Sequence, residues 1–247
     1  MPRTHRLLVD LRTMMQASTA LDRAALDLTI RQIERRLAKA DPVMKRLIAK
    51  HGHCPIAERE FEPFHMLANS IISQQLSTRA AATIKQRVGI LVGMPFQIGK
   101  VLSTAPAELR GAGLSGAKTR YIGELAAHIS DGRLDFEEIV SLNDEAVIEK
   151  LVIVPGIGRW TAEMFLLFGL KRLDVLAIGD AGLQRAARNL YGKKRSSSTL
   201  LPRVAESWRP YRSIAVSVAI VRDIRLHAGF FVSIQVSIIC CDDTTRP

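Results

Sequence analysis

Apolar residues recur every three or four positions along most of the chain, and this spacing predicts a protein made of helices. Between residues 24 and 38 the apolar positions alternate with arginines, as on a surface helix with one buried stripe. They are Leu26, Ile30, Ile33 and Leu37. The period stops over residues 51–63, which contain two prolines, so we expect a linker there. The period resumes at Phe64.

Residues with capping side chains stand ahead of several predicted helices. The candidate caps are Ser77, Ser103 or Thr104, Ser115, and Asn143 or Asp144. Pro106 would occupy the first turn of the helix that follows Thr104. With short connections between these helices, the chain is expected to be all-α up to about residue 215. From residue 231 to 239, apolar residues alternate with serine and glutamine, which is a strand-like period in an otherwise helical protein.

Charge and cysteine content indicate which partners the protein binds and which metal and disulfide classes it does not belong to. Across 247 residues, 35 lysines and arginines stand against 24 acidic residues, a net charge of +11. A surplus of this kind favours a polyanionic partner such as nucleic acid, although it also fits an anionic membrane surface or simple solubility. Cys54, Cys240 and Cys241 are too few and too badly spaced for a four-thiolate metal site, and their odd number argues against a secreted disulfide framework.

The sequence gives no expectation of a membrane span or a secretory signal. The longest apolar run, residues 230–241, is shorter than the ~20 residues that a membrane helix needs and is interrupted by polar residues. The basic start of the chain lacks the apolar block of a secretory signal, while an organellar transit peptide stays open. We expect a protein of the reducing cytoplasm, associated with the nucleoid, or of the nucleus or an organelle in a eukaryote.

Residues 155–163, PGIGRWTAE, join two predicted helices through a very short turn. Such a turn leaves backbone amides at the start of the second helix, and those amides together with the helix dipole suit a phosphate. The glycines would let a phosphodiester come close, and Arg159 would add positive charge. The alternative to a phosphate-binding turn is an ordinary tight turn between two helices, because glycine and proline are common at helix ends.

The helix after this turn has two apolar faces, so one of them is expected to line something other than the main core. Trp160, Met164 and Leu167 fall on one face. Asp180 follows, directly ahead of a basic helix that begins AGLQRAARNL. A carboxylate in that position is a sound helix N-cap, and it is also kept ionised by the helix dipole, as a catalytic anion must be.

Together these residues resemble a known family. The segments LVIVPGIGRWTAEMFLLFG and DVLAIGDAGLQRA are similar to the helix-hairpin-helix base-excision DNA glycosylases, most closely the alkylation-repair branch, the 3-methyladenine DNA glycosylases. The resemblance extends to SIISQQLSTRAAATI, LRGAGLSGAKTRYIGELA and WRPYRSIA, and so covers roughly residues 61 to 215. It implies two helical subdomains flanking a cleft and carrying a helix-hairpin-helix motif.

The resemblance implies a division of the chain and a set of DNA contacts. We expect an N-terminal helical segment over residues 1–62, a central helical domain over 63–170 ending in the hairpin motif, a helical segment over 171–215 and a divergent tail over 216–247. The hairpin would bind DNA phosphates. Its residues are Pro155, Gly156, Ile157, Gly158, Arg159 and Thr161. A Na⁺ or K⁺ ion held by hairpin carbonyls is implied as well, with no other metal.

The resemblance also assigns the chemistry. Asp180 matches the catalytic aspartate, which would stabilise positive charge on the sugar or activate water. Trp160 stands where the related bifunctional enzymes have a lysine, so it cannot form a Schiff base. Its indole would stack on a flipped, cationic alkylpurine, with Met164 in the same wall. The alternative for both residues is core packing.

Residues 74–76 are here called the wedge turn. They resemble the family's wedge, whose side chains enter the gap that an extruded nucleotide leaves in the DNA. Gln75 and Leu76 are the candidate wedge residues, and Gln74 would contact a minor-groove edge or a phosphate. A polar helix joint with Leu76 in the core is the alternative. Lys118 and Arg120 are assigned to the basic surface. His65, near the wedge turn, is assigned to packing or to the surface.

Two departures from the family pattern stand out. The four clustered cysteines of the endonuclease III branch are absent, so we predict no iron-sulfur cluster. After Ala215 the chain lacks the usual tryptophan-rich helix and looks unlike a helix that completes an α fold. We therefore predict a monomeric, monofunctional glycosylase that excises alkylated purines from damaged duplex DNA without a cofactor. The alternative is a noncatalytic helix-hairpin-helix DNA-binding protein with an impaired pocket.

Overall fold

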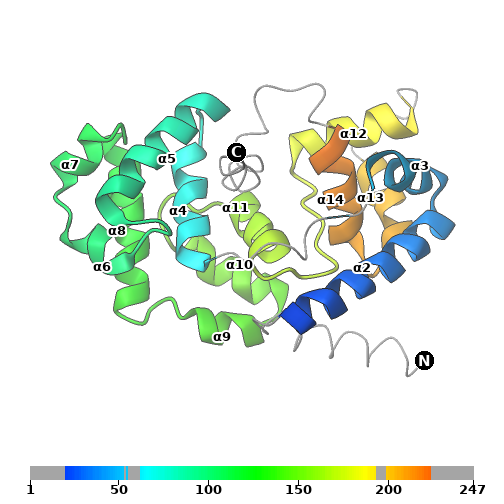
Figure 1. The fold of residues 1–247 in the computed structure, drawn as a ribbon, viewed down its shortest axis with the longest axis horizontal. Helices are drawn as coiled ribbons and strands as arrows, with labels where there is room; N and C mark the ends of the chain where they lie inside the picture. The colour runs from blue at the N-terminus through cyan, green and yellow to red at the C-terminus, as the bar shows by residue number, and fades with distance from the viewer. Residues whose placement is uncertain (1–19, 53, 55–61, 193–198, 224–247) are drawn as a thin grey trace. The chain divides into compact units, whose positions relative to one another are not determined.

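The computed structural model of the chain describes residues 20–52, 54, 62–192 and 199–223 (Figure 1). Within these ranges every regular element is helical, so the all-α prediction is confirmed for them. The chain divides into two compact units. Unit 1 takes its described residues from Met1–Glu60 and Leu170–Leu226, and unit 2 takes them from Phe61–Gly169.

Unit 1 brings together helices from the two ends of the chain. Its elements are α2 (Ala20–Ala40), α3 (Pro42–His51), α12 (Ala181–Tyr191), α13 (Leu200–Ala205), the 3-10 turn η4 (Glu206–Trp208) and α14 (Arg212–Asp223). Figure 1 shows α14 beside α3 and α12, although α3 and α14 lie at opposite ends of the sequence. The core of unit 1 includes Leu37 of α2, Met44 of α3 and Ile214 of α14, each at most 2% exposed.

A buried carboxylate ties the two parts of unit 1 to each other. Asp41 caps α3 by accepting from Val43 N at 2.7 Å, and it also accepts from Trp208 Nε1 at 2.9 Å and from the Tyr191 hydroxyl. Because Asp41 is buried, these donors replace the water that its charge would otherwise require. Burial, together with the neighbouring carboxylate, raises the pKa of the Tyr191 phenol, so the hydroxyl remains a donor.

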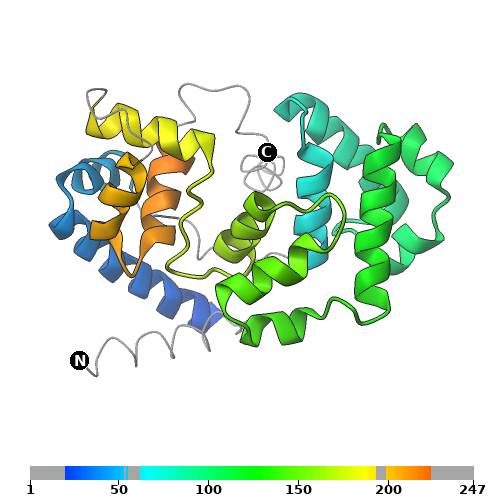
Figure 2. The ribbon, with the colours of Figure 1, turned by 180° about the vertical axis from the view of Figure 1, so that it is seen from behind.

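Unit 2 is built around one helix that is buried on almost every side, α4 (Pro63–Ser73). It packs against α5 (Thr78–Val92), α8 (Gly116–Ser130) and the π-helical turn η2 (Phe165–Gly169). The remaining elements are α6 (Ile98–Ser103), α7 (Pro106–Gly111), α9 (Phe136–Ser141), α10 (Asp144–Val152) and α11 (Arg159–Met164). Figure 2, the view from behind, shows the short connections that join these helices.

Three of the predicted caps are confirmed by hydrogen bonds. Ser77 accepts from Ala80 N at 3.3 Å, Ser115 accepts from Lys118 N at 3.3 Å, and Asn143 accepts from Ala146 N at 3.0 Å. Asn143, rather than Asp144, is therefore the cap of α10.

The prediction that Ser103 or Thr104 caps the helix at Pro106 is wrong. Both hydroxyls donate backwards to Lys100 O, at 3.2 and 2.7 Å, and so satisfy the end of α6 instead. Helix α7 begins after Ala105, whose N–H donates to the Glu108 carboxylate at 3.0 Å. Pro106 does occupy the first turn, as expected.

The chain stays helical beyond Ala215. Helix α14 continues to Asp223, so the expectation of a non-helical sequence directly after Ala215 is wrong for residues 216–223. Residues 224–247, with the strand-like period at 231–239, lie outside the described residues, as do most of the linker and two of the three cysteines. Among the described helices, none combines the length and the apolar character that crossing a bilayer requires.

Candidate active site and DNA interface

The predicted hairpin forms between α10 and α11 in unit 2. Val154 N donates to Leu151 O and Ile157 N donates to Val154 O, both at 3.1 Å, so the chain reverses within a few residues. Ile157 is 4% exposed and anchors the turn in the unit, while Pro155 and Gly158 are exposed. Gly158 is the N-cap of α11, and the first amides of that helix have no acceptor within the helix.

The two hairpin glycines are needed for different reasons. Gly156 has a φ of +88°, and a β-carbon placed there would come within 2.5 Å of Tyr121 Cδ2 on α8. A β-carbon on Gly158 would meet nothing within 4 Å. Gly156 is therefore required by the packing of the hairpin inside unit 2, whereas Gly158 lies where the hairpin faces open space.

Arg159 makes ion pairs within the hairpin motif itself. Its terminal nitrogens donate to the Glu145 carboxylate on α10 at 2.6 and 2.8 Å, and Nε donates to Glu163 at 3.3 Å. Hydrogen bonding from Arg159 lowers the pKa of the Glu145 carboxyl below its usual value. Arg159 and Glu145 are each 58% exposed, so water and salt screen the pair and a phosphate can compete for the guanidinium.

The tryptophan after the hairpin is partly buried, while the residues that follow it point inward. Thr161 is 5% exposed and Met164 is 1% exposed, so both belong to the core of unit 2. After Met164 the helix widens into the π-helical turn η2, a local distortion that is frequent near functional sites. Trp160 is thus the more accessible member of the predicted base-binding pair, and the roles of both residues toward a base stay predictions.

The wedge turn follows the end of α4 and has a strained backbone. Gln75 is exposed and has a φ of 58°, in the left-handed region that residues other than glycine rarely occupy. Leu76 N donates to Ser73 O at 3.2 Å, and Leu76 itself is half-buried. A strained conformation of this kind persists only where surrounding contacts hold it.

Two side chains hold the wedge turn through hydrogen bonds. The Gln74 side-chain amide donates to Gly156 O of the hairpin at 2.8 Å, and its contact with a minor-groove edge or a phosphate stays a prediction. Lys118, assigned from sequence to the basic surface, donates from Nζ to Ile72 O at 2.7 Å and to Gln74 O at 2.6 Å. Helical periodicity places Lys118 on the same side of α8 as Tyr121, but no local sequence signal indicates that Lys118 binds carbonyls 44 and 46 residues away.

Asp180 lies in unit 1 as the N-cap of α12. Its Oδ1 accepts from Leu183 N at 2.7 Å, and the residue is only 5% exposed. Gln184 supports the same turn, because its N–H donates to Asp180 O at 2.9 Å and its side-chain amide donates to Ile178 O at 2.7 Å. The capping interpretation is therefore correct, and it fixes the direction of a carboxylate at a helix N-terminus.

The segment that leads to Asp180 is held by the first turn of α14. Ser213 N donates to Leu173 O at 2.9 Å, and Ser213 Oγ accepts from Val175 N at 3.0 Å. Asp174 accepts from Arg212 Nε at 2.7 Å and from Arg209 at 3.0 Å. These contacts join two segments that lie 38 residues apart in the sequence, and they give the loop before Asp180 a defined path.

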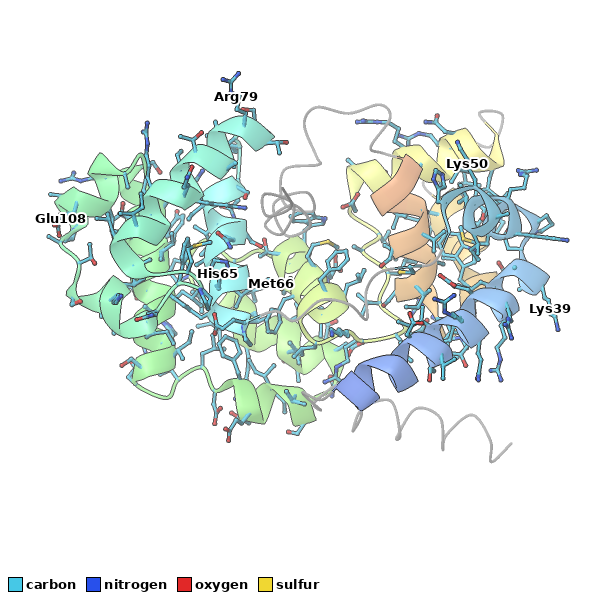
Figure 3. The ribbon with its side chains drawn as sticks, viewed as in Figure 1. Lys39, Lys50, His65, Met66, Arg79 and Glu108 are labelled. Carbon is cyan, nitrogen blue, oxygen red and sulfur yellow. The ribbon has the colours of Figure 1, made fainter. Side chains whose placement is uncertain are left out.

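His65 (Figure 3) packs edge-on against the Phe96 ring, so of the two predicted alternatives, packing and surface, packing is observed. Its Nδ1 accepts from Phe96 N at 3.0 Å, which requires that nitrogen to be unprotonated. Burial, and secondarily the charge of Lys85, lowers the His65 pKa from 6.5 to about 4. With Nδ1 accepting, Nε2 carries the proton, and an Asn69 amide turned to present its oxygen would accept it at the 2.7 Å contact. Within the described ranges, His, Cys, Asp and Glu side chains form no group that could hold a metal ion.

Known proteins resemble the chain over most of this region. The sequence model of the HhH-GPD superfamily base excision DNA repair proteins matches residues 68–210. A DNA-3-methyladenine glycosylase of Saccharomyces cerevisiae is 44% identical over 131 residues, which are 49% of this chain and 44% of the yeast protein. The match thus spans less than half of that relative.

Two solved structures share the fold over longer stretches. A DNA-3-methyladenine glycosidase from Bacillus halodurans superposes with a TM-score of 0.63 at 36% identity, covering 79% of this chain and 94% of the other. The 3-methyladenine DNA glycosylase of Schizosaccharomyces pombe, solved in complex with abasic DNA, gives a TM-score of 0.65 at 27% identity and covers 76% and 94%.

Proposed function

The chain belongs to the HhH-GPD superfamily of base excision DNA repair proteins, and we propose that it is a monofunctional DNA glycosylase that removes alkylated purines, such as 3-methyladenine, from duplex DNA. The observation that carries the proposal is the joint presence of a tight hairpin followed by Trp160 and of a buried, capping Asp180. The relatives' names and the abasic DNA bound to the fission-yeast enzyme support the same substrate class.

The hairpin supplies sequence-independent binding. Backbone amides at the start of α11 bind phosphate oxygens regardless of base, and the open space at Gly158 admits the DNA backbone. Hairpin carbonyls are neutral oxygen ligands that suit Na⁺ or K⁺, and Gly156 O already accepts from Gln74. A structural cation would therefore use the neighbouring carbonyls, and the chemistry needs no other cofactor.

Trp160 and Asp180 carry specificity and chemistry. Alkylation at a ring nitrogen gives the purine positive charge, and an indole face attracts such a ring more than a neutral base. Cleavage of the glycosidic bond places positive charge on the sugar, which the Asp180 carboxylate stabilises until water adds at the anomeric carbon. The base leaves with the bonding electrons, and the proton lost by water balances the charge.

Base release from a methylated duplex tests the proposal directly. Wild-type protein should release alkylated purine and leave alkali-labile sites. Asp180→Asn should lower the rate about a hundredfold or more, because the anion is lost. Since asparagine also accepts a capping bond, this variant should keep the wild-type melting temperature, whereas Asp180→Ala loses about 1 kcal/mol of stability as well.

Wild-type protein that binds duplex DNA but releases no base would instead identify a noncatalytic DNA-binding protein. Turnover by Asp180→Asn at the wild-type rate would remove the catalytic assignment while leaving the glycosylase proposal in place.

A further inference from the structure

Three elements of unit 2 meet through side-chain hydrogen bonds at the wedge turn. Lys118 Nζ, from α8, donates to Ile72 O at the end of α4 and to Gln74 O in the wedge turn. Gln74 in turn donates to Gly156 O in the hairpin. These bonds form a continuous connection from α8 through the wedge turn to the hairpin, which we call the Lys118–Gln74–Gly156 link.

A second contact joins α8 to the same hairpin residue. The ring of Tyr121 lies so close to Gly156 that a β-carbon there would meet Cγ at 2.7 Å. Lys118 and Tyr121 are three residues apart and share one face of α8. One face of α8 therefore holds the wedge turn through Lys118 and the hairpin through Tyr121.

The chemistry of the link suits a positioning role. The last carbonyls of a helix carry partial negative charge, and an ammonium group there is favoured by the helix dipole. Burial lowers the Lys118 pKa, so the amine is placed at some cost in solvation and is retained by its two acceptors. The same bonds fix Gln74, the residue directly before Gln75, and Gln75 has a left-handed backbone conformation that persists only where surrounding contacts hold it.

We infer that Lys118 and Gln74 are positioning residues that set the wedge turn at a fixed place relative to the phosphate-binding hairpin, so that gripping the backbone also pushes the turn into the base stack. This inference rests on the proposed function. Extruding a nucleotide costs unstacking and unpairing energy, so the group that fills its place in the stack must be held firmly. A loose turn would let Gln75 relax to an ordinary conformation, and the hairpin would bind DNA without opening it.

Gln74 could contact DNA directly, or it could act through the Lys118–Gln74–Gly156 link, and the two roles predict different results. If Gln74 contacted DNA directly, its loss would weaken binding to every duplex. Loss of Lys118, whose amine is bound to the carbonyls of Ile72 and Gln74, would then matter little. If both residues act through the link, each loss should spare undamaged duplex and reduce the preference for a duplex that is already open. The two losses should also not add, because either one breaks the same connection.

The experiment compares affinities for a duplex with a stable abasic-site analogue and for an undamaged duplex, by fluorescence anisotropy. Gln74→Ala and Lys118→Met should each lower the ratio of the two affinities about fivefold to tenfold, as expected for a lost hydrogen bond. The double variant should fall no further. Lys118→Arg, which keeps the donors, should restore most of the ratio. Fluorescence of 2-aminopurine beside the lesion should report less base opening in the same variants.

Two exposed residues of unit 2 provide matched controls: Gln86→Ala on α5 and Lys100→Met on α6 make the same chemical changes away from the link and should leave the ratio unchanged. If Gln74→Ala lowers the melting temperature, Gln74→Glu is tested in its place. It keeps the shape of the side chain and replaces the hydrogen-bond donor with an acceptor.

The outcomes also separate this inference from the proposed function. A wild-type preference for the abasic analogue that Gln74 and Lys118 variants retain would overturn the inference alone. Equal loss of affinity for both duplexes would do so too, since it indicates direct DNA contact. Wild-type protein with no such preference and no base release would overturn both.

Discussion

Arg159 is bound through two hydrogen bonds to Glu145, and this ion pair connects the helices on either side of the hairpin. The arginine expected to meet a DNA phosphate is thus engaged by a carboxylate in the DNA-free protein. If Arg159 binds a phosphate, as predicted, the phosphate replaces the carboxylate, and the exposure of both partners keeps the energetic cost of this exchange small.

We expect Glu145→Gln to tighten binding to undamaged duplex severalfold at low salt, because it frees Arg159 for phosphate. The salt dependence of log K should steepen by about 0.9, the contribution of one additional phosphate contact. Glu149→Gln makes the same change at an exposed position on the same helix and serves as the control for net charge. Weaker binding by Glu145→Gln would instead mean that the pair is needed to keep the hairpin in shape.

The hairpin glycines should respond differently to alanine. Gly158→Ala should leave the melting temperature near wild type and weaken binding to any duplex about tenfold, because its methyl group enters the space that phosphate needs. Gly156→Ala should lower stability by about 2 kcal/mol or more, from its positive φ and its clash with Tyr121. A thermal melt and anisotropy on two unrelated duplex sequences separate the effects. Loss for one sequence only would contradict a phosphate contact.

The identity of residue 160 predicts that the protein does not cut the strand. With no amine at this position, product DNA should contain intact abasic sites that break only in alkali, and borohydride should trap little protein on damaged DNA. Trp160→Ala should slow excision by the equivalent of about 1–3 kcal/mol, one lost stacking contact. Trp160→Phe should recover part of the rate. Efficient trapping would reveal another reactive amine, and a Trp160→Ala protein that fails to fold would assign Trp160 to the core.

His65 should make stability depend on pH. Its pKa is about 4 in the folded protein against an ordinary value of 6.5. The unfolded chain therefore binds more protons between these values, so stability is complete above pH 6.5 and is lost as pH falls toward 4. After allowance for the exposed part of the ring, the loss is about 2 kcal/mol. Denaturant melts from pH 7 to 4 should show this fall in wild type and a smaller one in His65→Gln.

Sequence patterns predicted the features that depend on neighbours in the chain. Ser77, Ser115 and Asn143 were identified as caps because a cap acts within three residues of itself. The hairpin and the capping position of Asp180 followed from the same local signals. Thr104 shows the limit of such signals. Its hydroxyl could cap the helix that follows it or donate to a carbonyl of the helix before it, and it donates to Lys100 O.

Contacts between distant segments could not be predicted in this way. Gln74 and Gly156 are 82 residues apart, and Lys118 is 44 residues from Gln74. The sequence around Gln74 is the same whether its side-chain amide binds the hairpin or DNA. Only the fold decides which acceptor lies within reach of that amide. Helix α3 was not singled out either, although Asp41 and Pro42 mark its start. The attachment of Asp174 to α14 is likewise a property of the folded chain.

Unit 1 is made from two stretches of chain with unit 2 inserted between them, and this order has a consequence for biosynthesis. Asp41 can bind Tyr191 and Trp208, which are 150 and 167 residues away, only after those residues have been synthesised, whereas the described residues of unit 2 form one continuous stretch. On the ribosome, unit 2 can fold while α2 and α3 still expose their apolar faces to chaperones. The nascent protein thus completes its hairpin before α12, which Asp180 caps, can pack in unit 1, so the proposed phosphate-binding element forms earlier in synthesis than the proposed catalytic one.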